Sequence, residues 1–142
     1  MTDAKVLKRI YITHCSRDKD PEYEASGLKT TPDLLYTSAG LQRFIQYCNE
    51  HHHYWAIFSD RYGVVFRDER IKWYSKPPDS VTESEFEELV TNFVTRLSFF
   101  DEVHFYQREG ENHPLFQRVI DRARQQGMNV RDFTDGNMDR DE

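Results

Sequence analysis

The sequence predicts one α/β domain: a three-layer, Rossmann-like sandwich in which helices cover both faces of a mainly parallel sheet of four or more strands. The chain has 142 residues, which is the size of a single domain. Strand-like and helix-like segments alternate along it, and this alternation favours right-handed βαβ crossovers. Ten Phe, eight Tyr and two Trp supply enough apolar area for a core.

The first part of the chain predicts two strands separated by a long polar segment and a helix. Residues 6–13 are rich in Val, Leu, Ile and Tyr, which is typical of a strand. Residues 14–32 are polar and lack periodicity, and a loop of that length in a compact domain is usually functional or disordered. From Ser38 apolar residues recur at helical spacing. Residues 54–59 form the continuous apolar run of a strand buried on both faces.

A second polar segment and a well-marked helix follow. Residues 60–79 are polar, with a short strand signal at 64–66. Thr82 and Glu85 have the spacing of a capping box at the start of a helix. The apolar stripe of that helix consists of Phe86, Leu89, Val90, Phe93, Val94 and Leu97.

The last third predicts a strand, a helix and a final strand. Residues 102–106 alternate as a strand does, and residues 114–127 begin with Pro and end with Gly, as helices often do. Residues 128–133 predict the last strand. We therefore expect one domain over residues 1–133 and an acidic flexible tail over residues 134–142.

The charge distribution argues against general nucleic-acid binding. The net charge is −6, but residues 1–80 carry twelve Lys and Arg against eleven Asp and Glu. The remaining residues carry seven against fourteen. Because phosphate affinity comes mainly from basic side chains, nucleic acid is expected to bind through a local site in the first half, if at all.

The sequence also predicts a cytoplasmic protein with no membrane partner. No apolar run approaches the roughly 20 residues needed to span a bilayer. The amino-terminal residues show no secretion signal. Two cysteines, Cys15 and Cys48, cannot form a disulfide framework, which favours a reducing compartment. The oligomeric state is not indicated.

The first polar segment carries the residues most suited to chemistry. Cys15 is the candidate catalytic residue, because cationic neighbours lower the pKa of a thiol and the thiolate is the nucleophile. Alternatively, Cys15 is a small apolar filler where the strand meets the loop. Ser16 and Arg17, with nearby Lys19, could instead hold a phosphate or carboxylate. The glycine-rich phosphate loops GxGxxG and GxxxxGK[ST] are absent.

The second polar segment leaves another predicted strand and adds candidate ligand contacts. Ser59 could donate to a ligand, and Gly63 would permit close approach. Tyr62 and Tyr74 could stack on a planar base, and Lys76 could contact an anion. The alternative is an ordinary strand exit followed by a solvated lysine. In parallel sheets ligands bind outside the carboxyl ends of strands, so both polar segments are expected on the same rim.

No metal or cofactor site is indicated. The run His51-His52-His53 contains metal-ligand side chains, but adjacent residues on a helix point in different directions. We therefore expect a solvated helix end there, where positive charge suits the helix dipole. Metal-binding spacings such as CxxC and HExxH are absent.

Three motifs together resemble a known family. They are THCSRDK after the first strand, LYTSAGLQRF at the first helix, and IFSDRYGVV followed by IKWYSKP. They resemble the small uncharacterised bacterial and archaeal domain (DUF6884-like) grouped with the YaaA-like peroxide-stress proteins. That pattern is roughly C-S-K-x-K, L-Y-x-S-x-x-F and S-A-K-Y-G-L, and the resemblance spans residues 10–76. A more distant likeness is to the core domain of archaeosine synthase, which points towards modified bases.

The resemblance implies an α/β fold and a shared polar rim, with no established reaction. This chain departs from the pattern at Arg17 and Asp18, where lysines are common, and at Asp60 and Arg61, where Ala and Lys are usual. The family positions imply site residues Cys15, Ser16, Arg17, Lys19, Tyr36, Ser38, Ser59, Tyr62 and Gly63. Together with Arg61, Tyr74 and Lys76 they form the predicted site.

Three functions are compatible with these residues. The first is an enzyme or enzyme-like domain that acts on a nucleobase, nucleotide or nucleic acid. The second is a stress-response module that binds a small anionic or base-containing ligand in the same pocket without turnover. The third is a protein-interaction domain that uses its acidic second half.

Overall fold

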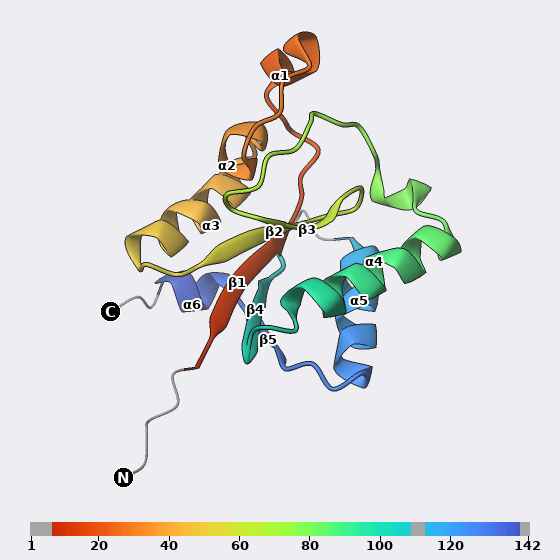
Figure 1. Ribbon diagram of the computed structural model, residues 1–142. Coiled ribbons are helices and arrows are strands. Elements are labelled where there is room, and N and C mark those ends of the chain that lie inside the picture. The colour runs from red at the N-terminus through yellow and green to blue at the C-terminus, as the bar shows by residue number, and fades with distance from the viewer. Residues whose placement is uncertain (1–6, 109–112, 140–142) are drawn as a thin grey trace.

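The fold is built on one five-stranded sheet (Figure 1). The computed structural model describes residues 7–108 and 113–139. The strand order is β3-β2-β1-β4-β5, and β3 alone runs antiparallel to its neighbour. The mixed α/β fold with a mainly parallel sheet is thus confirmed. The strands are β1 Arg9–His14, β2 Trp55–Ser59, β3 Gly63–Phe66, β4 Glu102–Tyr106 and β5 Val130–Phe133.

The antiparallel strand β3 follows β2 after only three residues. So short a connection makes a hairpin, whereas a parallel neighbour needs a long crossover. The turn ends at Gly63, whose φ of +77° suits glycine. A Cβ at Gly63 would also lie 2.3 Å from Asn92 Oδ1. Asn92 Oδ1 accepts a hydrogen bond from the Val64 N–H at 2.8 Å, which ties the hairpin to the helix behind it.

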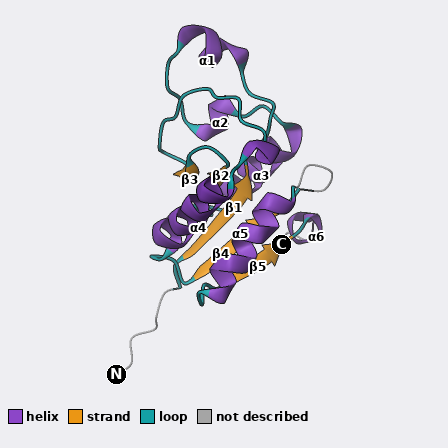
Figure 2. Ribbon diagram, turned by 90° about the vertical axis from the view of Figure 1, so that its right-hand side faces the viewer, coloured by secondary structure: helices purple, strands orange, loops and turns teal. Residues whose placement is uncertain are grey.

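Helices α3 (Ala39–Glu50), α4 (Glu83–Leu97) and α5 (Pro114–Gln125) contact the sheet. On one face the ring of Phe44 from α3 stacks on Tyr106 at 5.7 Å. On the opposite face Phe58 contacts Phe93 of α4 and Phe116 of α5. Figure 2 shows α4 and α5 side by side over the sheet. The predicted capping box is confirmed, because Thr82 and Glu85 cap α4 reciprocally.

The two long polar segments form a cap above the carboxyl ends of the strands (Figure 1). The cap contains the short helices α1 (Pro21–Ser26), α2 (Pro32–Leu35) and η1 (Pro78–Ser80). Isolated bridges pair Lys19 with Tyr36 and Thr30 with Ile71, and so tie the cap segments to one another. These helices have six residues or fewer, too short to leave a periodic pattern in the sequence.

The end of the described chain forms a sixth α-helix within the segment for which a flexible tail was predicted. Helix α6 spans Asp135–Asp139, and Met138 is buried against the core. Tyr106 donates a hydrogen bond to Asp135, and Arg43 of α3 pairs with the same carboxylate at 3.4 Å. Among the described residues no helix is long and apolar enough to cross a bilayer.

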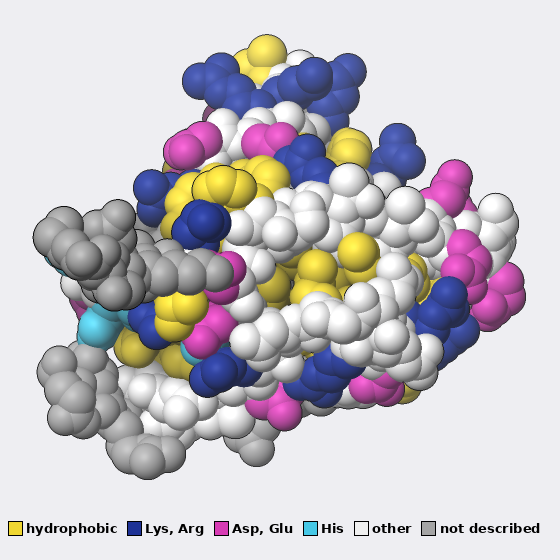
Figure 3. Space-filling model, turned by 60° about the horizontal axis from the view of Figure 1, so that its bottom comes forward, with side chains coloured by type: hydrophobic (Ala, Val, Ile, Leu, Met, Phe, Trp, Pro, Cys, Tyr) yellow, Lys and Arg dark blue, Asp and Glu magenta, His cyan; other side chains and the backbone are white. Residues whose placement is uncertain are grey.

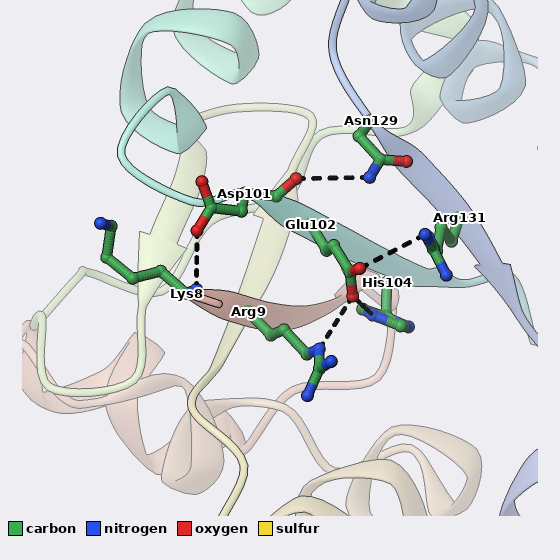
Figure 4. Close-up of polar contacts among 7 residues, drawn as sticks. All are labelled: Lys8, Arg9, Asp101, Glu102, His104, Asn129 and Arg131. Carbon is green, nitrogen blue, oxygen red and sulfur yellow. Dashed lines mark hydrogen bonds and ion pairs between the residues drawn. The ribbon is translucent and has the colours of Figure 1, made fainter. Parts of the chain in front are cut away.

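At the amino-terminal edge of the sheet one carboxylate forms hydrogen bonds and ion pairs with several side chains (Figure 4). Glu102 is 7% exposed and receives hydrogen bonds from Arg9 Nε at 2.8 Å and His104 Nε2 at 3.0 Å. Arg131 lies 3.3 Å from its other oxygen. These hydrogen bonds and charges lower the pKa of Glu102. Seen from this end of the sheet, acidic and basic side chains are interspersed over the visible surface (Figure 3).

Candidate functional site

A pocket of about 780 Å³ lies where β1, β2 and β4 end, and we call it the rim pocket. Its walls come from segments that follow each of these strands, so the two polar segments do meet on one rim. β1 and β4 are adjacent, and the chain crosses from one side of β1 to the other between β3 and β4. This is the topological switch point at which open α/β sheets usually bind ligands.

Asp60 is the buried carboxylate of the rim pocket. It follows β2 directly and is 3% exposed. The thiol of Cys15 donates to Asp60 Oδ1 at 3.6 Å, whereas Oδ2 has no hydrogen-bond partner among the described residues. Burial raises the pKa of Asp60, because desolvation disfavours the charged form. An ionised carboxylate can only accept hydrogen bonds, so Oδ2 is an unused acceptor.

Cys15 sits beside Asp60 as a neutral thiol. Burial, and next the negative charge of Asp60, raise the pKa of Cys15 to about 12. At neutral pH the thiolate, which is the nucleophilic form, is therefore scarce. Asp60 does provide an acceptor for the thiol proton. The catalytic role of Cys15 stays a prediction.

Lys19 is a half-buried cation in the same pocket. Its Nζ donates to the Arg17 carbonyl at 3.3 Å and lies 4.3 Å from the centre of the Tyr74 ring. Burial lowers the pKa of Lys19, and no described carboxylate lies within ion-pair distance of its Nζ. Lys76, by contrast, pairs with Glu85 at 3.3 Å. Lys19 is thus a desolvated positive charge that an anion would stabilise.

Three hydroxyl groups form a hydrogen-bonded network at the pocket wall. Tyr36 and Tyr74 share a hydrogen bond of 2.5 Å, and Ser59 Oγ donates to the Tyr74 hydroxyl at 3.0 Å. Ser59 Oγ also accepts from the backbone N–H groups of Arg61 and Tyr62. Burial raises the pKa of both Tyr36 and Tyr74, so they remain neutral. This network holds the Tyr74 ring in place under Lys19.

The carboxyl end of β1 is fixed by Arg108, which is 2% exposed. Its guanidinium donates to Thr13 Oγ1 at 3.0 Å, to the His14 carbonyl at 2.5 Å and to the Cys15 carbonyl at 3.1 Å. The His14 ring stacks on Phe116 at 4.8 Å. Burial and the nearby Arg108 charge lower the pKa of His14 to about 3, so it is neutral. Arg108 shapes the turn that carries Cys15.

The first turn of α3 also lines the rim pocket. Ser38 Oγ accepts from the Leu41 N–H at 3.4 Å, which starts the helix. Ala39 and Gly40 follow and face the pocket. The N–H groups at the start of a helix have no acceptor within the helix and carry a partial positive charge.

The predicted site residues fall into three groups. Those in the pocket wall are Cys15, Ser16, Arg17, Lys19, Ser38, Tyr74 and Lys76. Tyr36 and Ser59 lie behind the wall and hold it. Arg61, Tyr62 and Gly63 belong to the β2–β3 turn, outside the pocket lining. There the Tyr62 ring meets the Tyr74 ring edge-on at 5.3 Å.

Sequence reasoning missed much of the lining, including its polar or aromatic residues Asp60, Trp73, Arg108 and His113. Asp60 was visible as a departure from the family pattern, and a charged residue directly after a buried strand was the available signal. Arg108 and His113 come from the far side of the sheet, after β4, and nothing local in the sequence marks them.

The histidine run lies away from the rim pocket. His53 stacks on Tyr11 at 4.0 Å, and His51 stacks on Tyr47 at 4.2 Å. Across residues 7–108 and 113–139 no group of three or more His, Cys, Asp or Glu side chains could hold a metal ion.

Comparisons of the chain with protein-family models, with curated proteins and with solved structures gave no match. The functional argument therefore depends on the rim pocket itself.

Proposed function

We propose that the protein binds a nucleobase or nucleotide in the rim pocket. The observation that carries the proposal is Asp60, a buried carboxylate in the pocket whose Oδ2 lacks a partner among the described residues. A buried polar atom without a partner costs free energy, and a ligand with N–H donors would remove that cost. The amino groups of adenine, guanine and cytosine are such donors.

The other walls of the pocket suit the same ligand. Trp73 offers aromatic surface to a planar ring, and stacking on a base contributes about 1–3 kcal/mol. Lys19 offers positive charge to a phosphate. A volume of about 780 Å³ lies within the usual range for small-molecule sites, about 300–1,000 Å³.

Binding without turnover is the function this geometry favours. A thiol whose pKa is raised to about 12 is a poor nucleophile at neutral pH, so the protonation state of Cys15 supports a binding module over a thiolate enzyme. An enzyme acting on the bound base, and a protein-interaction module, remain the alternatives. We further propose a three-layer Rossmann-like sandwich and membership of the YaaA-like family, supported by helices on opposite faces and by the three motifs.

Isothermal titration with a panel of ligands tests the proposal. The panel contains adenosine, guanosine, cytidine and uridine, their 5′-monophosphates, the free bases and a short single-stranded oligonucleotide. We expect a ligand with an exocyclic amino group to bind more tightly than its uracil counterpart. Asp60→Asn should weaken that binding at least about tenfold, because a hydrogen bond to a charged group contributes about 1.5–3 kcal/mol.

Asp68→Asn is the matched control, because Asp68 is exposed and lies outside the rim pocket. It should bind as the wild type does. The proposal fails if no member of the panel binds, or if Asp60→Asn binds as tightly as the wild type while its melting curve shows a folded protein.

A further inference from the structure

The rim pocket has two poles, and they require different chemistry from a ligand. Asp60 offers an acceptor without a partner at one place in the wall. The first turn of α3 and Lys19 offer positive charge in the same pocket, where the charges of Lys19 and Asp60 also interact. We infer that the ligand is bipolar: it presents N–H donors to Asp60 and an anionic phosphate or carboxylate to the start of α3. This inference rests on the proposed function and specifies the nucleotide form.

The net charge of the pocket supports an anionic group. Among the described lining residues there are four cations, Arg17, Lys19, Lys76 and Arg108, and two carboxylates, Asp18 and Asp60. Because Lys76 pairs with Glu85, the other lining residues carry a formal charge of +1 in a chain whose net charge is −6. A pocket with an excess of one sign of charge concentrates ligands of the opposite sign.

The backbone brings Lys19 beside the start of α3. Lys19 and Tyr36 form an antiparallel bridge, and the Thr37 N–H donates to the Asp18 carbonyl at 3.0 Å. Tyr36 precedes the helix cap Ser38 by two residues. The side chain of Lys19 and the first turn of α3 thus line the same pocket. An anion there would gain from both the side-chain charge and the helix dipole.

Asp60 favours an anion that also carries N–H donors over a lone anion. A lone anion near Asp60 would be repelled by an ionised carboxylate and would leave Oδ2 without a donor. A ligand that carries donors and an anion on one framework satisfies both poles at once. A nucleoside 5′-monophosphate has this form, and a free nucleoside satisfies the Asp60 pole alone.

The experiment compares each nucleoside with its own 5′-monophosphate by isothermal titration. We expect the monophosphate to bind the wild type at least about tenfold more tightly, as charge-assisted contacts predict. Lys19→Met should reduce this preference about tenfold. Lys72→Met is the control, since Lys72 is exposed and outside the pocket lining, and it should keep the preference.

Ala39→Pro tests the backbone N–H groups separately. Proline is favoured at the first helical position and removes one N–H, and Ser38 already has the extended backbone (φ −59°, ψ 135°) that precedes proline. We expect the preference for the monophosphate to fall about two- to fivefold, the size of a helix-dipole contribution. Asp60→Asn should weaken nucleoside and monophosphate alike.

The outcomes separate this inference from the proposed function. The inference is overturned if nucleosides bind as tightly as their monophosphates, or if the preference survives in both Lys19→Met and Ala39→Pro. If no nucleobase compound binds, the proposed function fails. Titration with inorganic phosphate and acetate at fixed ionic strength then tests whether the pocket binds an anion. Binding of either that Lys19→Met abolishes supports the pole and identifies its anion, and no binding overturns it.

Discussion

Two buried carboxylates lie at opposite ends of the same sheet and have opposite surroundings. Glu102, at the amino-terminal edge, is held by Arg9, His104 and Arg131 (Figure 4). Asp60, at the carboxyl-terminal rim, receives one weak contact from Cys15 and keeps an oxygen without a partner among the described residues. The surroundings lower the pKa of Glu102 and raise that of Asp60.

The difference separates a carboxylate that stabilises the fold from one that we propose binds a ligand. A carboxylate with several donors stabilises the fold, whereas a buried carboxylate that lacks donors destabilises it. Functional sites retain such local costs because a ligand or reaction uses them. The contrast indicates that Glu102 stabilises the fold, whereas for Asp60 we propose a role in ligand binding.

The largest effect is expected at Arg108, a buried cation at the carboxyl end of β1. Arg108→Met removes the donors to Thr13 Oγ1 and to two carbonyls of the β1 exit, and leaves those acceptors buried. We expect the free energy of unfolding to fall by about 3 kcal/mol or more. Urea denaturation measures it. Arg9→Met at the other end should cost much less, since Arg9 is half exposed, and an equal loss would contradict the inference that Arg108 fixes the carboxyl end of β1.

Glu102→Gln should destabilise the protein at neutral pH and have little effect in acid. The lowered pKa means that the ionised form is stabilised in the folded state. That stability is present above the ordinary Glu pKa of 4.5 and is lost as the pH falls through the lowered folded value. Urea denaturation of the wild type and of Glu102→Gln between pH 2 and 7 measures how the free energy of unfolding of each depends on pH. A difference that grows towards low pH would contradict the account.

Asp60→Asn should show the opposite dependence on pH. Because the folded pKa is raised, the protonated form is favoured in the folded state, and stability is lost as the pH rises from the ordinary Asp value of 3.8 through the folded value. The neutral amide avoids this loss. We expect the variant to gain stability relative to the wild type as the pH rises to 7. Loss of stability relative to the wild type over that range would show that Asp60 is structural.

The smallest expected effect concerns the reactivity of Cys15. In a Cys48→Ala background, alkylation by iodoacetamide at pH 8 should be slower than that of a free thiol, because the Cys15 pKa is raised. Adding Asp60→Asn removes the negative charge that contributes to this rise and should accelerate alkylation. Fast alkylation in the Cys48→Ala parent would contradict a raised pKa and support the hypothesis that Cys15 is a nucleophile.

Local signals explain what the sequence could predict of the fold. The capping box at Thr82 and Glu85 was correct because it depends on side chains three residues apart. The predicted strand over residues 102–106 matches β4, because a strand pattern is also read from neighbouring residues. The antiparallel pairing of β3 and the short cap helices escaped prediction. They depend on a three-residue turn and on bridges between distant segments.

The position of the candidate site could be predicted from the sequence, but several residues that line it could not. Parallel strands end on one edge, so the two polar segments had to meet there. Whether a polar residue is buried depends on the whole fold, so Asp60 could not be told from a solvated aspartate. The turn into β3 places Arg61 and Tyr62 outside the pocket lining. The sequence did not reveal this, because both residues closely follow the end of a predicted strand, as residues of the pocket do.

The pKa of Asp60, measured with and without ligand, tests the central claim most directly. Carbon-13 NMR of aspartate-labelled protein follows the carboxyl resonance, and Asp60→Asn assigns it. We expect a raised pKa in the free protein, and a fall when the tightest-binding nucleotide is added, because N–H donors stabilise the ionised form. An ordinary pKa in the free protein, or a raised pKa that saturating nucleotide leaves unchanged, would contradict the claim that Asp60 accepts from the ligand.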